Sequence, residues 1–292
     1  MVTVLFGALY RPLVTGDATL GQFQRARVLW DWLNLLLVLG ILAVSAYLFN
    51  SLLRRTEHSR EDQRIQAERE IASSNLQEAA LEAYLDRMTR LLLDKELLAS
   101  KPTDVVHIIA RAQTLTIVRK LDGARKGTLL RYLHELGLLE KEPLMDLAGA
   151  DLSGADLTFG TLSGTNLSGV DLSKANLWMA DLRGSTLARS NLSRVDARGA
   201  NFNDDDLTAA DLGGATLPAT SLNEAKLVEA DLSGATLTHA DLGKADLTRA
   251  YLNRAYAKAS KLGNADLRWA RMQEATLSEA DLRAAVLLEA TL

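Results

Sequence analysis

Residues 150–169 read ADLSGADLTFGTLSGTNLSG, and the five-residue spacing seen here runs from Leu147 to Leu292 without an insertion or deletion. Thirty positions share this register, of which 26 are leucine and four are not: Ala197, Phe202, Ala257 and Met272. The side chain two residues before these positions is mostly small, and it is alanine in twenty cases. An unbroken fixed period is typical of proteins built from stacked repeats.

A period of five fits neither an α-helix, which places apolar residues about 3.6 apart, nor a β-strand, which places them 2 apart. It fits three extended residues followed by a two-residue corner, such as Ser153-Gly154. The first and third side chains of each side then point inward and the middle one outward. Four sides close a coil of twenty residues, so the repeats predict a rod of about 7.5 coils, roughly 36 Å long at the spacing of hydrogen-bonded strands.

Asp205 interrupts the apolar pattern, because the register places its side chain inside the coil. A buried carboxylate without a partner is costly. We therefore expect a local distortion over residues 203–206, with Asp205 either turned to solvent or accepting hydrogen bonds from backbone amides.

The motif Ala-(Asp/Asn)-Leu-X-X, as in residues 150–154 and 230–234, resembles the pentapeptide-repeat family. The resemblance implies a mainly β fold, a right-handed quadrilateral β-helix over residues 145–292. Residues 84–95 and 121–139 also resemble a region found ahead of the repeats in membrane-anchored bacterial members, notably cyanobacterial ones. That similarity implies an anchor, a helical module and a β-helix in this order, and no particular activity.

A segment of 21 residues without a charge, residues 33–53, precedes the helical region. As a helix it spans roughly the 30 Å hydrocarbon core of a bilayer. Trp30 and Trp32 flank one end and Arg54 and Arg55 the other, as expected at membrane interfaces. We predict a single transmembrane helix, preceded by an N-terminal segment, residues 1–32, that has no signal-peptide pattern.

The distribution of arginines gives an orientation for this predicted span. Five arginines follow it closely, whereas two precede it closely and Arg11 lies slightly further away. The positive-inside rule then places the β-helix in the cytoplasm. The chain contains no cysteine, which excludes disulfides and cysteine-based redox or zinc chemistry.

Two helical segments connect the span to the repeats. Residues 54–100 predict a helical stalk with an apolar stripe of Leu81, Leu85, Met88 and Leu92, and whether it forms a coiled coil stays open. Residues 101–144 predict a small helical cap module. Its first helix is expected to start after a cap at Thr103 or Asp104 and to run to about Leu121, and its second to run from about Gly127 to Leu136, ended by Gly137.

The sequence favours a non-enzymatic protein. Its four histidines have no partner at metal-ligand or catalytic spacing. Motifs for a serine nucleophile, a phosphate-binding loop or a dinucleotide site are absent from the sequence. We therefore expect no catalytic residue, no cofactor and no metal. The aspartates in the middle of each repeat are expected to face solvent and bond to the corner backbone.

Phe159, Trp178 and Met179 occupy outward positions in the first coils and form the candidate partner-binding site. An exposed apolar cluster indicates an interface, which favours a membrane-anchored scaffold for an unidentified protein partner. The alternative is that the helical module covers these side chains. At the other end, an uncovered coil exposes strand edges and apolar residues, which predicts an end-to-end homodimer through Val286, Leu287, Leu288 and Leu292.

Two further functions fit the pattern less well. The resemblance includes proteins that mimic duplex DNA and bind DNA gyrase, but residues 145–292 carry 20 acidic and 14 basic residues, a weak charge for a mimic. The second is nucleic-acid binding by residues 101–144, where Arg119, Lys120, Arg125, Lys126 and Arg131 cluster. Residues 54–144 contain 16 basic and 15 acidic residues, so no basic field supports it.

Overall fold

The computed structural model describes the chain at residues 20–94, 97, 101, 104–140 and 145–292, without the side chains of residues 20–31, 52–59 and 94. Most of the expected N-terminal segment, residues 1–32, therefore lies outside the described residues. The described chain forms two compact units, Met1–Ile71 and Ala72–Leu292, which we treat separately.

Helix α1 (Leu20–Asp94) continues through the boundary expected between the predicted span and the stalk. In the first unit it contains Trp32–Ser51, a stretch with mean hydropathy 2.2 that is long and apolar enough to cross a membrane. None of this stretch is buried within the protein, unlike the core helix of a globular domain. The side chains of Trp30, Arg54 and Arg55 lie outside the described residues, whereas Trp32 is exposed.

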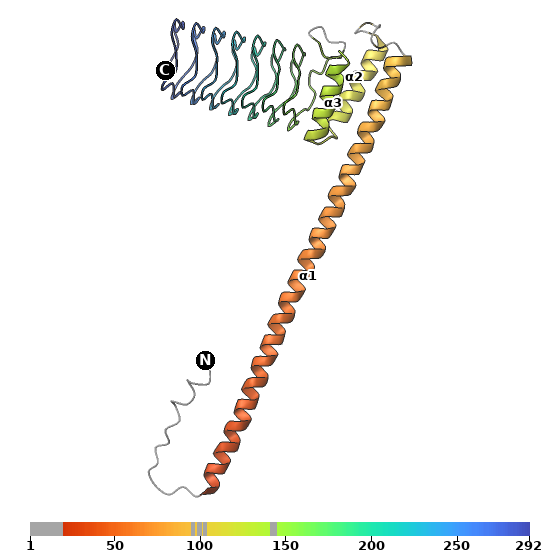
Figure 1. The fold of residues 1–292 in the computed structure, drawn as a ribbon, viewed down its shortest axis with the longest axis vertical. Helices are drawn as coiled ribbons and strands as arrows, with labels where there is room; N and C mark the ends of the chain where they lie inside the picture. The colour runs from red at the N-terminus through yellow and green to blue at the C-terminus, as the bar shows by residue number, and fades with distance from the viewer. Residues whose placement is uncertain (1–19, 95–96, 98–100, 102–103, 141–144) are drawn as a thin grey trace. The chain divides into compact units, whose positions relative to one another are not determined.

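The second unit begins with the C-terminal part of α1, followed by α2 (Val105–Val118) and α3 (Gly123–Glu135) (Figure 1). Helix α3 starts four residues earlier than expected, because the Asp122 side chain caps it by accepting a hydrogen bond from the backbone N–H of Arg125 at 2.9 Å. Its predicted end is confirmed. Gly137 has a φ of 68°, and the N–H of Leu138 reaches the carbonyl of Leu133 at 3.1 Å, as in a Schellman motif.

The three helices of this unit pack around a shared apolar core. Tyr84 and Met88 of α1 are buried with Leu129, Leu130 and Leu133 of α3. The hydroxyls of Tyr84 and Thr114 form a buried hydrogen bond of 2.7 Å that joins α1 to α2. Burial of these groups is what makes the amphipathic stripe of the stalk helix stable at its C-terminal end.

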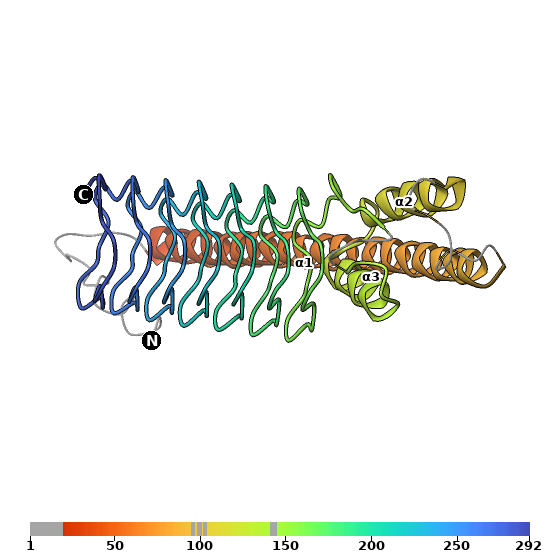
Figure 2. The ribbon, with the colours of Figure 1, turned by 90° about the horizontal axis from the view of Figure 1, so that it is seen from above.

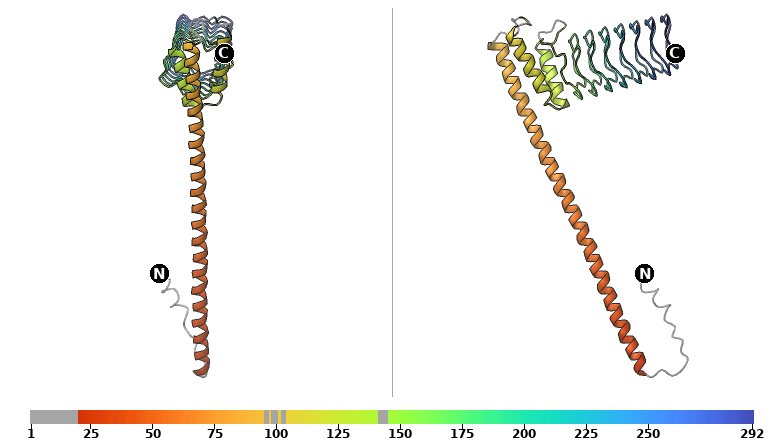
Figure 3. Two further views of the ribbon diagram at one scale, coloured as in Figure 1. Left: turned by 90° about the vertical axis from the view of Figure 1, so that its right-hand side faces the viewer. Right: turned by 180° about the vertical axis from the view of Figure 1, so that it is seen from behind.

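The repeats form a four-sided β-helix (Figure 2). Parallel bridges join each middle residue to the one 20 positions later, in four ladders that begin at Asp151, Asp156, Thr161 and Asn166. We call the corresponding walls side 1 to side 4, and Figure 3 (left) shows them along the coil axis. The expected three-residue strands are not seen within residues 145–292: each side pairs through an isolated bridge, because the corners on both sides leave no room for a longer ladder.

Every corner places its second residue in the left-handed region. The carbonyl of the central residue accepts the N–H three residues later, as from Ala150 to Leu147 at 2.8 Å. Such a turn needs a positive φ at its third residue, where glycine is favoured. Among the described corners, 21 have a non-glycine residue there, with φ from 54° to 62°. The coil therefore maintains a backbone strain that its stacking and its core must offset.

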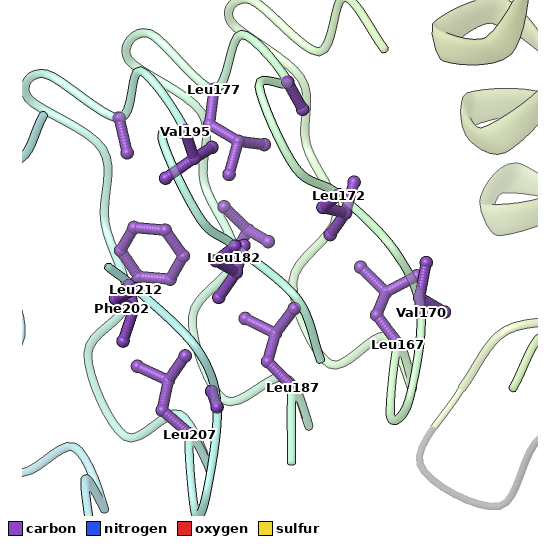
Figure 4. Close-up of a cluster of buried hydrophobic side chains, with 14 of the residues drawn as sticks. Leu167, Val170, Leu172, Leu177, Leu182, Leu187, Val195, Phe202, Leu207 and Leu212 are labelled. Carbon is purple, nitrogen blue, oxygen red and sulfur yellow. The ribbon is translucent and has the colours of Figure 1, made fainter. Parts of the chain in front are cut away.

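The interior is filled by the two inward side chains of each side (Figure 4). Leucines of successive sides point toward one another, and the alanine positions leave room for them. Phe202 and Ala197, two exceptions to the leucine pattern, are both fully buried. Fully burying a leucine contributes about 1.5–3 kcal/mol, so the repeated core is the main source of stability.

Helix α3 closes the first coil through its backbone. The N–H of Asp156 has no preceding coil to pair with, and it donates to the carbonyl of Gly123 at 2.8 Å. The side-chain ammonium of Lys126, itself buried, donates to the carbonyl of Ser153 at 2.9 Å. A Cβ at Gly127 would lie 1.9 Å from the carbonyl oxygen of Asp156. Only glycine permits this close approach of a helix to the coil edge.

Replacing a left-handed corner alanine by glycine is expected to stabilise the β-helix. Ala219 has a φ of 55°, so Ala219→Gly relieves strain and should raise the free energy of unfolding by up to about 1 kcal/mol. Ala240→Gly makes the same change at a buried inward position and should lower it by about 1 kcal/mol. Thermal unfolding of the full-length protein in detergent, followed by circular dichroism, should rank Ala219→Gly above wild type and Ala240→Gly below it. An equal loss of thermal stability in both variants would contradict the proposed backbone strain at Ala219.

Replacing Gly127 by alanine is expected to separate α3 from the first coil. Because the new methyl group meets backbone, the helix must shift, and the amide of Asp156 should exchange its hydrogen severalfold faster. Hydrogen exchange with mass spectrometry measures this on peptides covering residues 150–160. Thr128→Ala, at the neighbouring exposed helix position, serves as the control and should leave the exchange unchanged.

Candidate interaction surfaces

Phe159, Trp178 and Met179 form one cluster at the corner that follows side 2, which we call the aromatic patch. Phe159 and Met179 hold equivalent left-handed positions one coil apart, with φ of 54° and 56°. The N–H of Phe159 donates to the carbonyl of Trp178 at 2.9 Å, and the two ring centroids are 4.9 Å apart at 54°. The stacking of coils thus brings together three side chains that are up to twenty residues apart in the chain.

The aromatic patch is open to solvent. Phe159, Trp178 and Met179 are 62%, 44% and 50% exposed, although the helical module docks on the first coil, which contains Phe159. The expectation that this module covers them is wrong, because α3 docks on the corner Ser153-Gly154 and on Asp156 of side 2, one corner before Phe159. An exposed apolar cluster of this kind is characteristic of an interaction surface.

The last coil presents a second apolar surface, which we call the end surface. It contains Val286, Leu287, Leu288 and Leu292, which are all exposed. Side chains equivalent to Leu287 and Leu292 in the preceding coils are buried between neighbouring coils. Among the described residues, Leu287 and Leu292 thus expose the inward positions that a stacked coil covers elsewhere, whereas Val286 and Leu288 hold outward positions.

The aspartates and asparagines on the sides bond to the corners, as expected. The carboxylates of Asp211 and Asp231 accept the N–H groups of Gly213 and Ser233, both at 2.8 Å. This bond recurs through the repeats and fixes the start of each corner. Repetition makes these carboxylates structural, and they do not form a separate acidic site.

Two residues of the basic cluster of the helical module, Arg125 and Lys126, are engaged within the protein. Arg125 pairs with Glu78 at 2.8 Å and also with Asp122. Lys126 pairs with Asp151 at 3.2 Å and is buried. Cations with internal carboxylate partners are poorly placed to neutralise phosphates, so these two residues contribute little to nucleic-acid binding by residues 101–144.

The histidines do not assemble a reactive site in the described structure. The Nδ1 atom of His134 lies 2.9 Å from the hydroxyl of Thr165, at the junction between α3 and the first coils. His107 is buried in α2, and His239 occupies a left-handed corner. Among the described residues, no group of three or more His, Cys, Asp or Glu side chains could hold a metal ion.

Asp205 is buried without distorting the coil. The ladder continues through Asp206 on its usual partners, so the expected distortion over residues 203–206 and the turn to solvent are both wrong. The alternative of a cap on backbone amides is confirmed, because its Oδ1 accepts the N–H of Ser185 at 2.8 Å. Its Oδ2 has no hydrogen-bond partner. Burial raises the pKa of Asp205 to about 8, against the lowering effect of the backbone N–H.

These features define a repeat solenoid with two exposed apolar surfaces and no assembled catalytic site in its described residues. The family model for pentapeptide repeats matches residues 150–189, 165–204, 206–242, 219–254 and 250–287. The repeat region of this chain belongs to the pentapeptide-repeat family. Proteins of this family are generally structural or interaction proteins.

This chain is also similar to solved structures of other pentapeptide-repeat proteins. HetL, involved in heterocyst differentiation regulation in the cyanobacterium Nostoc, is 24% identical over 55% of this chain and 93% of its own, with a TM-score of 0.25. A pentapeptide repeat protein of the Arabidopsis thaliana thylakoid lumen is 30% identical over 40% and 68%, with a TM-score of 0.26. QnrB1, a plasmid-mediated fluoroquinolone resistance protein, is 19% identical over 43% and 72%, with a TM-score of 0.27. No curated protein matches this chain.

The buried carboxyl of Asp205 should make stability depend on pH. Below pH 4 the group is protonated in both states, whereas between about pH 4 and 8 only the unfolded chain releases the proton. Stability is therefore lost as pH rises through this window, by at most about 1.4 kcal/mol per pH unit. Asp205→Asn should raise the thermal midpoint more at pH 8 than at pH 5. Asp211→Asn, on an exposed side, is the control, and equal effects of the two substitutions at both pH values would count against the argument.

Proposed function

We propose that this protein is a membrane-anchored scaffold that binds a partner protein at the aromatic patch. The observation that carries the proposal is the exposure of Phe159, Trp178 and Met179 on a rigid, repeated backbone. Aromatic and methionine side chains are enriched at protein interfaces, and a few such residues supply most of the binding energy. The solenoid holds them in fixed positions, so little conformational entropy is lost on binding.

The membrane anchor in this proposal is the apolar part of α1. Trp32–Ser51 has the length and hydropathy of a span, and its side chains are not covered within the protein. Trp30 and Trp32 at one end and Arg54 and Arg55 at the other are the proposed interface residues. The larger number of arginines after the span favours a cytoplasmic β-helix.

The scaffold proposal includes self-association through the end surface. Its exposed leucines and unpaired strand edges match the surface that each coil offers to the next. A second copy placed end to end buries Val286, Leu287, Leu288 and Leu292 of both chains in a closed, two-fold arrangement.

Cross-linking in native membranes followed by mass spectrometry tests the proposal. Full-length wild type is expected to give reproducible links from the aromatic patch to one partner protein, and from the end surface to a second copy. Phe159→Ala and Trp178→Ala should lose the partner links and retain the links between copies, because the two surfaces are separate.

His239→Ala is the matched control, since His239 occupies the same corner as Met179 three coils further on and is left-handed in the same way. It should leave both sets of links intact. Links confined to one chain, unchanged in Phe159→Ala and Trp178→Ala, would overturn the partner site.

A further inference from the structure

A groove lies on the later coils, at the corner between side 4 and side 1. It is lined by Ala209, Glu229, Arg249, Tyr251, Trp269 and Arg271. The corner stack supplies Ala209, Glu229, Arg249 and Trp269, which are 20 residues apart, and side 1 supplies Tyr251 and Arg271. We call this the arginine–aromatic groove.

An arginine guanidinium group lies over each aromatic ring of the groove. The guanidinium carbon of Arg271 lies 5.1 Å from the ring centroid of Tyr251, and that of Arg249 lies 5.7 Å from the ring of Trp269. The rings remain partly open, with Tyr251 36% and Trp269 40% exposed. Stacking on a ring fixes an arginine in place while leaving its N–H donors free for a planar anion.

The two arginines differ in their carboxylate partners. Arg249 makes a long contact of 3.4 Å with Glu229, and both side chains are more than half exposed. Arg271 has no carboxylate within ion-pair distance among the described residues. In contrast, five other arginines of the β-helix form ion pairs with a carboxylate at 2.5–2.8 Å: Arg183, Arg198, Arg254, Arg268 and Arg283. The indole N–H of Trp269 donates to Glu289 at 2.6 Å, which orients the ring toward the groove.

We propose that the arginine–aromatic groove binds an acidic peptide segment of a partner protein. A carboxylate of that segment pairs with the free guanidinium of Arg271, and a second one competes with Glu229 for Arg249. Apolar side chains between the carboxylates cover Tyr251 and Trp269. Planar guanidinium–carboxylate pairing together with aromatic contact gives such a groove both specificity and affinity.

Charge favours an acidic peptide over a nucleic acid. Glu229 and Glu289 border the groove, and Asp211 and Asp231 precede Tyr251 on the same side. A phosphate backbone carries a charge at every nucleotide and would meet these carboxylates. A peptide can place its few carboxylates on the two arginines and leave the acidic neighbours in solvent.

This inference goes beyond the proposed function, because it does not depend on a partner at the aromatic patch. The corner after side 4 lies diagonally across the coil from the corner after side 2. Trp269 also lies several coils beyond Trp178. The β-helix thus carries two sites that two partners can occupy together.

Fluorescence anisotropy of a labelled peptide with two glutamates separated by leucine and serine residues tests the groove on the full-length protein in a zwitterionic detergent. A matched peptide with glutamine in place of both glutamates reports the contribution of charge. We expect the glutamate peptide to bind more tightly, with an affinity that falls as salt rises. Arg271→Gln should weaken it about tenfold, the loss expected for one charge-assisted hydrogen bond, and Trp269→Phe should lower it less.

Arg283→Gln is the control, because Arg283 is another exposed arginine and already pairs with Asp281 on another side; it should leave binding unchanged. Phe159→Ala should also leave it unchanged, which separates this site from the aromatic patch. Equal binding of the two peptides, or full binding by Arg271→Gln, would overturn the proposal. Preferential binding of oligothymidylate that depends on Arg271 would overturn it in favour of a nucleic acid.

Discussion

The whole β-helix depends on one constraint, the closure of each coil in twenty residues. Backbone hydrogen bonds join residues 20 apart, so every inward side chain stacks on an inward side chain of the next coil. A single inserted residue would turn leucines outward and break the ladders on all later sides. The chain therefore keeps its register without exception over thirty repeats, while the outward positions are free to differ.

The period predicted the architecture because the interior allows few alternatives. A narrow square core accepts one alanine-sized and one leucine-sized side chain on each side, and both appear in the sequence as a repeated pattern. The corners were less predictable. Many hold arginine, glutamate or alanine where glycine would signal a positive φ, and only the cooperative stacking of coils forces these residues into the left-handed region.

Asp205 and the aromatic patch show where sequence reasoning stops. The position of Asp205 was predictable, but its burial depends on the N–H of Ser185 one coil earlier, which local pattern does not reveal. Likewise, whether the helical module covers Phe159 depends on the docking of α3. That docking depends on Gly123 and Gly127, which lie within α3 and leave room for the backbone of the first coil. Helix propensity alone would count both glycines as evidence against a helix there. Of the arginine–aromatic groove, the sequence alone shows only that Asp211 and Asp231 of side 1 are followed by Tyr251 and Arg271.

The four-sided register also means that the position of a surface site along the β-helix can change only in fixed steps. Adding or removing twenty residues would move a surface site by one coil, roughly 4.8 Å, and keep it pointing in the same direction. Adding five would instead turn every later site by a quarter of a revolution. Two docking sites on one solenoid can thus change their separation and their relative direction independently, in fixed steps, by whole-repeat duplication and without any new packing in the core.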